Sequence, residues 1–310
     1  MSNMRRFLAT NILLMVGLCG WGASVLCAQE PDDEGQRQIF ADEFTNTRPG
    51  GPRRSPRTAS APRSKPADNK STENNQTQAS TMLGITFWRL RPAAANDDTQ
   101  ARFLEQESDS ESILVGERVN SDTKFKEGQK VRLSIESPRT GYLYVIDREQ
   151  YADGTYSDPY LIFPTLKTRS GDNAVTAGRL IEIPDQDDRP PYFKMNRHRA
   201  DQTGEVLTIM VMSQPLPNLK LERKALKLTN EQFAQWQQKF NAAVKRVDLA
   251  NHAGKTYTKT EKDAGASDKT LLKPNDPPPQ TIYLITTKLG EALMINVTLQ
   301  YETATSPKTN

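Results

Sequence analysis

The clearest pattern of apolar and polar positions lies within residues 125–164. Apolar residues alternate with polar ones over residues 131–135, which is typical of a strand with one buried face. Residues 142–146 are apolar at every position, as expected of a strand that is covered on both faces. Residues 160–163 are a further short apolar run, which Pro164 ends. Turn residues separate these runs, so the stretch predicts three strands.

Further strands are predicted on both sides of this stretch, from the same alternation and from flanking Pro and Gly residues. They are residues 85–90, 113–115, 179–184, 205–212, 281–287 and 291–301. The last two predict a hairpin around Gly290, and the final run alternates without a break.

One helix is predicted to interrupt the β pattern, over residues 230–247. Thr229 and Gln232 have the spacing of a capping box. The apolar stripe that follows at helical spacing comprises Phe233, Trp236, Phe240, Val244 and Val247. Such a stripe covers the protein's own sheet or docks a partner protein, and we expect it to cover the sheet. Residues 251–280 predict a flexible loop that ends in three prolines.

The N-terminus predicts export. Arg5 and Arg6 precede an apolar run over residues 7–18, and small residues lead to Ala28, which is the order of a secretory signal peptide. The run is too short to span a bilayer, so we expect cleavage after Ala28 and no transmembrane segment in the mature chain. Lipid attachment at Cys27 is the alternative, but a bulky leucine precedes that residue. The protein is therefore expected in the periplasm or outside the cell.

Residues 29–81 predict a disordered linker, because Pro, Ser, Thr, Asn, Gln and charged residues dominate them. Acidic residues come first and basic residues follow. The basic part could tether the protein to an anionic surface, but its charges are spread among prolines, which favours a solvated linker.

Composition removes several classes of function. The formal net charge is only +3, which gives no overall electrostatic case for nucleic acid. The 2 cysteines, Cys19 and Cys27, both lie in the predicted signal, so the mature chain would lack disulfides, catalytic thiols and cysteine-ligated zinc. His198 and His252 are isolated in sequence, which argues against a transition-metal site. No cofactor motif is present, and the oligomeric state is left open.

Together these patterns predict a mainly β protein, with an antiparallel β-sandwich-like domain over residues 82–301. One inserted α-helix interrupts it, the disordered linker precedes it, and residues 302–310 form a disordered tail.

The order of these elements resembles the bacterial exported family known as domain of unknown function 4384. The matching segments are residues 83–85, 125–133, 141–146, 161–165, 177–178, 183–184, 204–207 and 213–216, with Trp88, Ser137, Gly154, Asn173 and Phe193. The resemblance covers about residues 82–216 and implies a β-rich exported module. It implies no established activity, and this chain has no attached catalytic domain.

Candidate ligand-binding residues lie in two acidic loops between strands. The first loop contributes Asp147, Tyr151, Asp153, Tyr156 and Asp158, and the second contributes Asp185, Asp187 and Asp188. If the loops met at one end of a sandwich, their oxygens could bind calcium, although the spacing is not that of an EF-hand and acidic residues are common in turns. Tyrosines beside carboxylates also suit a glycan or a peptide.

We therefore expect a non-enzymatic interaction module of the bacterial envelope, which binds a protein or a glycan. No residue is assigned a catalytic or a metal-binding role. The alternative is a carboxylate-dependent hydrolase. A converging pair of buried carboxylates in a deep pocket would favour the hydrolase, whereas scattered exposed acids would exclude it.

Overall fold

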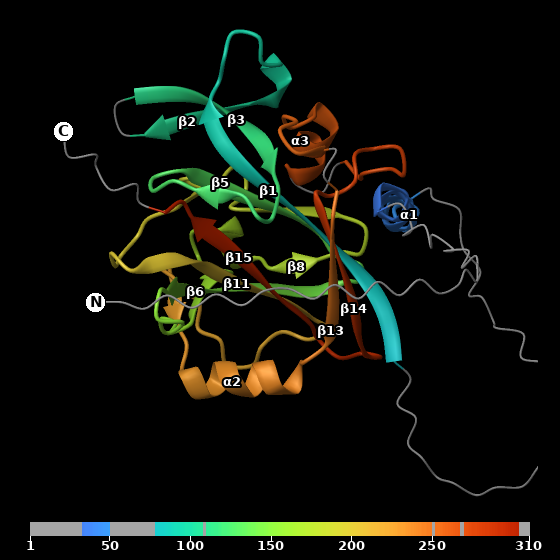
Figure 1. The fold of residues 1–310 in the computed structure, drawn as a ribbon, viewed down its shortest axis with the longest axis vertical. Helices are drawn as coiled ribbons and strands as arrows, with labels where there is room; N and C mark the ends of the chain where they lie inside the picture. Colours follow the sequence, from blue (N-terminus) through green and yellow to red (C-terminus); the bar gives the residue numbers. More distant parts are fainter. Residues whose placement is uncertain (1–32, 50–77, 108–109, 250–251, 267–269, 304–310) are drawn as a thin grey trace, which may run out of the picture.

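The computed structural model describes residues 33–49, 78–107, 110–249, 252–266 and 270–303. The predicted signal peptide, most of the predicted linker and most of the predicted tail lie outside these residues. The described residues form two β-sheets and three helices (Figure 1).

The first sheet has the order β10-β5-β1-β14-β13, with β3 and β2 attached through β1 and with β9 attached to β5. Its strands are β1 (Gln78–Pro92), β2 (Arg102–Glu107), β3 (Ser110–Val119), β5 (Lys130–Glu136), β9 (Leu180–Ile183), β10 (Phe193–Lys194), β13 (Ala243–Asp248) and β14 (Thr281–Lys288). All of its pairings are antiparallel.

The second sheet has the order β12-β7-β6-β11-β15-β4, and β8 pairs with β6. Its strands are β4 (Lys124–Phe125), β6 (Gly141–Tyr151), β7 (Tyr160–Phe163), β8 (Ala174–Val175), β11 (Gln202–Met212), β12 (Leu226–Lys227) and β15 (Leu293–Tyr301). The pairing of β15 with β4 is parallel, and the others are antiparallel. The mainly β fold that the sequence predicts is confirmed.

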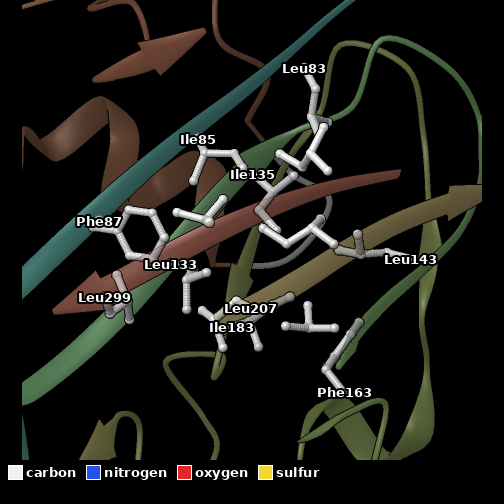
Figure 2. Close-up of a cluster of buried hydrophobic side chains, with 14 of the residues drawn as sticks. Leu83, Ile85, Phe87, Leu133, Ile135, Leu143, Phe163, Ile183, Leu207 and Leu299 are labelled. Atoms are coloured by element: carbon white, nitrogen blue, oxygen red, sulfur yellow. The ribbon is translucent and has the colours of Figure 1, made fainter. Parts of the chain in front are cut away.

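The main hydrophobic core fills the space between the two sheets (Figure 2). Leu83, Ile85 and Phe87 of β1 alternate along one side of their strand, and each is at most 1% exposed. They face residues of the second sheet such as Leu143 of β6 and Leu207 of β11. Burial of these alternating faces supplies most of the driving force for stacking the sheets.

The outer face of the second sheet is also covered. Tyr144 and Ile146 of β6 pack there against Phe233 and Phe240, which belong to helix α2 (Asn230–Lys239) and its C-cap. In Figure 1 this helix lies below β6 and β11. The prediction that β6 is covered on both faces is confirmed. The predicted packing of the helical stripe on its own sheet is confirmed for Phe233, Trp236 and Phe240. The Thr229 hydroxyl caps the helix by accepting the backbone N–H of Gln232.

The helix is shorter than predicted. It ends at Lys239, and the residues that follow form β13, which pairs with β14 along one edge of the first sheet. Val247 of β13 therefore belongs to another apolar cluster, whereas Val244 is 43% exposed. β-branched residues favour a strand wherever an edge is available, and the sequence pattern did not reveal that edge.

The predicted hairpin of residues 281–301 is wrong. β14 pairs with β1 and β13 in the first sheet, whereas β15 pairs with β11 and β4 in the second. The turn at Gly290, whose φ is +84°, therefore carries the chain from one sheet to the other. Two apolar strands separated by a short turn can pair with each other or stack face to face, because both arrangements bury the same side chains.

Two helices form in segments that the sequence predicted to be linker and loop. Helix α1 (Asp33–Thr45) packs Ala41 and Phe44 on the outer face of β13 and β14. Helix α3 (Lys259–Gly265) begins with a capping box between Thr258 and Glu261. The disorder predicted for residues 29–81 is therefore replaced by a helix over residues 33–45, and residues 50–77 lie outside the described part of the chain.

Buried ion pairs fasten these peripheral segments to the first sheet. Arg48, just after α1, is paired with Glu136 of β5 at 2.6 Å. Arg118 of β3 is paired with Glu261 of α3. Within the sheet itself, Arg132 of β5 is paired with Glu182 of β9 at 2.7 Å. In Figure 1 α1 and α3 lie on the side of the molecule away from α2. Two short 3-10 helices, Thr99–Ala101 and Arg169–Gly171, complete the described elements.

Candidate functional site

A cavity of about 160 Å³ opens between the two sheets, at one end of the main core. Its lining is contributed by β5, β6, β7, β11, β15 and the segment that contains β10. The apolar lining residues are Val131, Leu133, Ile162, Phe193, Met195, Leu207 and Leu299, and the polar ones are Asp147, Lys194, Asn196, His198 and Glu205. Figure 2 shows Leu133, Leu207 and Leu299 converging from strands of both sheets.

Three carboxyl groups replace apolar side chains on the inner face of the second sheet, and two of them, Asp147 and Glu205, line the cavity. Asp147 of β6 lies opposite Leu207 of β11, and Glu205 lies opposite Glu149. Asp147 and Glu205 are therefore diagonal neighbours on the face that further along carries Val145 and Ile209 of the core. The alternation that builds the core thus brings both carboxyls to the cavity.

Burial and the charges of neighbouring carboxylates keep this pair from ionising normally. Desolvation, followed by the charge of Glu149, raises the pKa of Asp147 to about 7. Desolvation, followed by the charge of Asp147, raises the pKa of Glu205 to about 9. A hydrogen bond from the Glu205 carboxyl opposes part of the shift at Asp147. Since two adjacent, largely desolvated carboxyls resist double ionisation, at least one of them is protonated at neutral pH.

The oxygens of the pair are only partly satisfied. Glu205 Oε1 accepts hydrogen bonds from the Gln202 amide at 2.7 Å and from the Tyr301 hydroxyl at 3.1 Å. Asp147 Oδ1 and Glu205 Oε2 are closed off from solvent, and no N–H or O–H group of the described residues reaches either of them. Apart from the proton that the two carboxyls can share, these oxygens have unused capacity to accept hydrogen bonds.

A third carboxylate, Glu149, lies between the pair and the protein surface, opposite Glu205 and beside His198. Glu149 accepts a hydrogen bond from the Tyr151 hydroxyl at 2.7 Å, and its other oxygen lies 2.5 Å from Nδ1 of His198. The His198 side chain is 71% exposed, so it lies at the mouth of the cavity. The Arg199 guanidinium stacks on the Tyr151 ring, 3.8 Å from its centroid. The mouth therefore combines aromatic, acidic and basic groups.

Of the residues predicted in the first acidic loop, the structure brings only Asp147 and Tyr151 to this site. Asp153 accepts hydrogen bonds from the backbone N–H and the hydroxyl of Thr155, as an exposed turn residue does. Tyr156 is exposed and lies beneath Arg148. Asp158 pairs with Lys227 at 2.5 Å and with the Asn230 amide at the start of α2.

The second acidic loop folds onto a different neighbour. Asp185 forms an ion pair with Arg169 at 3.0 Å. Asp188 accepts the backbone N–H groups of Arg169 and Asp185, while Asp187 is exposed. Among the described residues, the hydrogen bonds and ion pairs of Asp185, Asp187 and Asp188 do not reach the first loop. No group of three or more His, Cys, Asp or Glu side chains in that part of the chain could hold a metal ion. The geometry therefore offers no support for the calcium alternative.

Sequence reasoning missed Glu149, His198, Glu205 and Tyr301. One signal for Glu205 was present: it stands in phase with Leu207 and Ile209, so that a strand which buries them also turns Glu205 inward. Asp147 stands in the same relation to Leu143 and Val145. A carboxyl in phase with a buried face is the pattern that identifies this site.

No helix in the described part of the chain combines the length and the apolar character needed to cross a membrane. A scan against protein-family models matched none, and searches of curated proteins and of solved structures found no significant match. The resemblance to the 4384 family accordingly stays a prediction.

Proposed function

We propose that this protein is an exported, non-enzymatic binding module of the bacterial envelope, and that its ligand inserts one small group into the cavity between the sheets. Export is inferred from the N-terminal sequence. The observation that carries the binding role is the pair of partly satisfied carboxyls, Asp147 and Glu205, at a cavity that is otherwise largely apolar.

Such a pair is costly for the fold by itself. A buried carboxyl without a full set of hydrogen-bond partners destabilises a protein, whereas an apolar residue of similar size at either position would extend the core. Groups of this kind are concentrated at binding and catalytic sites. The ligand is an envelope protein or a glycan, since the mouth offers charged and polar side chains, such as Lys194, Asn196 and His198, that can hydrogen-bond either class of ligand.

A carboxylate-dependent hydrolase is the second candidate. The observation that favours it is the convergence of Asp147 and Glu205 with raised pKa values, because hydrolases use a carboxyl pair that shares a proton. The size of the cavity favours binding instead. About 160 Å³ accommodates one small group, whereas ligand pockets usually measure about 300–1,000 Å³. A scissile bond with its flanking groups and a water needs more room than this.

Affinity capture from envelope extract tests the proposal. The bait is the chain from residue 29 onward, compared with Glu205→Gln and with a matched control, Asp153→Asn, which changes an exposed carboxylate outside the cavity. We expect the unchanged chain and the control to capture the same species and Glu205→Gln to lose it. Equal capture by all three would show that the cavity is not the ligand site. Release of new cleavage products by the unchanged chain, but not by Glu205→Gln, would establish the hydrolase.

A further inference from the structure

We infer that the cavity binds a primary alkylammonium group, with the cationic nitrogen on Asp147 and Glu205 and the alkyl chain against the apolar wall. This inference rests on the proposed function, because it names the chemistry of the group that enters the same cavity.

The acidic end of the cavity has carboxyl oxygens that can accept further hydrogen bonds from a ligand. Asp147 Oδ1 and Glu205 Oε2 are shielded from solvent and, apart from the proton that the two carboxyls can share, receive no N–H or O–H donor from the described residues. An ammonium carries three N–H donors and no acceptor, so one nitrogen between the two carboxyls could satisfy both oxygens. The positive charge of the ammonium would also allow Asp147 and Glu205 to ionise, which burial and neighbouring negative charges disfavour in the unliganded protein.

The rest of the cavity lining is mainly apolar, which favours an aliphatic chain in the ligand. Val131 and Leu133 of β5 face Leu207 and Leu299 of the second sheet across the cavity. A cavity of about 150 Å³ with apolar walls accommodates a group of about six heavy atoms, and this cavity has about 160 Å³. An unbranched chain of four carbons with its nitrogen fits that volume. The union of an apolar stem with a cationic end is the chemistry of an alkylamine or a lysine side chain.

Other cations fit less well. A metal ion would need three or more ligating side chains in one group, which the described residues do not provide. A guanidinium has five donors in a rigid plane and binds best to several converging acceptors, whereas two free carboxyl oxygens are available here. The compact ammonium matches two acceptors.

Binding should release a proton. In the unliganded protein the pair holds at least one proton, and an ammonium favours the ionised form of both carboxyls. The other charged and titratable groups around the pair are Glu149 on β6, Tyr301 on β15, and Lys194, Arg197 and His198 on the segment that closes the mouth. Because an alkylammonium keeps its own proton up to about pH 10, affinity should rise with pH between about 6 and 9.

Titration calorimetry with the chain from residue 29 onward tests this inference. The probes are n-butylammonium, Nα-acetyl-lysine amide and n-butanol, the last as a neutral molecule of similar size. We expect saturable binding of the ammonium probes, tighter at pH 8 than at pH 6 by about tenfold or more. The apparent enthalpy should change between buffers of different ionisation enthalpy, since a proton is released. Asp147→Asn should weaken binding by about tenfold or more, whereas Asp153→Asn should leave it unchanged.

The outcomes separate this inference from the proposed function. Absence of binding by both ammonium probes, equal binding of n-butanol, or equal affinity in Asp147→Asn would overturn the ammonium assignment. If capture from envelope extract still depended on Glu205, the cavity would remain the ligand site for another chemistry. Binding of both ammonium probes would indicate lysine side chains of a polypeptide as ligands, and binding of n-butylammonium alone would indicate a free small amine.

Discussion

The contact between Arg48 and Glu136 predicts that the segment after α1 is an integral part of the folded domain. The Arg48 side chain is 0% exposed and the Glu136 side chain is 5% exposed. The guanidinium donates to both oxygens of Glu136, at 2.9 and 2.6 Å, and to the backbone carbonyls of Lys273, Asp276 and Pro277, at 3.1, 2.8 and 2.8 Å. Replacement of Arg48 by methionine would keep an unbranched chain but leave the carboxylate and three carbonyls without this donor.

The size of the expected change in the free energy of unfolding follows from the loss of the Arg48 guanidinium. Removal of one partner of a buried ion pair costs about 3–5 kcal/mol, because the other charge stays buried without compensation. Burial already raises the pKa of Glu136, so protonation of the carboxyl would relieve part of the cost. We therefore expect Arg48→Met to lower the free energy of unfolding by about 3 kcal/mol or more, and Arg48→Met combined with Glu136→Met to recover part of the loss.

Urea denaturation of the chain from residue 29 onward, followed by circular dichroism, measures these differences. The matched control is Arg246→Met, because Arg246 pairs with Asp248 at 3.1 Å with 50% of its side chain exposed, and exposed pairs contribute about 0–1 kcal/mol. If Arg48→Met cost no more than Arg246→Met, the segment after α1 would not be part of the cooperative fold. If Arg48→Met failed to fold, the weaker change Arg48→Lys, which keeps the charge, would supply the measurement.

Three further predictions concern the carboxyl pair, helix α2 and the linker. The raised pKa values of Asp147 and Glu205, about 7 and 9, mean that the folded state binds more protons than the unfolded state, so stability should fall as pH rises from about 4 to 9. The urea midpoint should change less between pH 5 and pH 8 in Glu205→Gln than in the unchanged chain. An equal change in both proteins would contradict the raised pKa of Glu205. Phe233→Ala should cost about 3–5 kcal/mol of stability, since Phe233 lies on the buried face of α2 and is 2% exposed. The control in the same urea assay is Val244→Ala, at a site that is 43% exposed. Replacement of residues 50–77 by a Gly/Ser linker of equal length, which allows α1 and Arg48 to keep their places, should not reduce capture from envelope extract, and a reduced capture would favour the tether.

The positions and the buried faces of many strands could be predicted from the sequence. The alternation of β5, β11 and β15 and the continuous apolar character of β6 are local properties, since period-two burial places each side chain on a known face. The apolar stripe of α2 was equally local for Phe233 and Phe240. These elements occur where the sequence predicts them because their apolar faces are long enough to dominate other preferences.

The failures share one physical cause. α1 has a polar composition and a short apolar face, and it is held by contacts of Phe44 with the first sheet and by Arg48 with Glu136, a residue distant in sequence. β13 forms because the edge of β14 is available to it. Such preferences are set by a partner surface and not by the segment itself.

The candidate site could also be predicted only in part from the sequence. The acidic loops were visible in the sequence, but most of their carboxylates serve turns and ion pairs, as Asp153 and Asp185 do. The orientation of Asp147 and Glu205 toward a buried face could also be read from their phase within apolar strands. Their convergence could not, because it depends on the register of β6 against β11 and on the second sheet that closes the cavity.

The sequence by itself therefore determined that the chain builds β-strands and which of their faces are buried, since both depend on the order of neighbouring side chains. Only the tertiary structure decided which strands share a sheet, that β14 and β15 belong to opposite sheets, and that two carboxyls meet beside an apolar cavity. The reason is that alternation specifies the direction in which a side chain points, whereas pairing and stacking depend on free energy gained between segments distant in the chain.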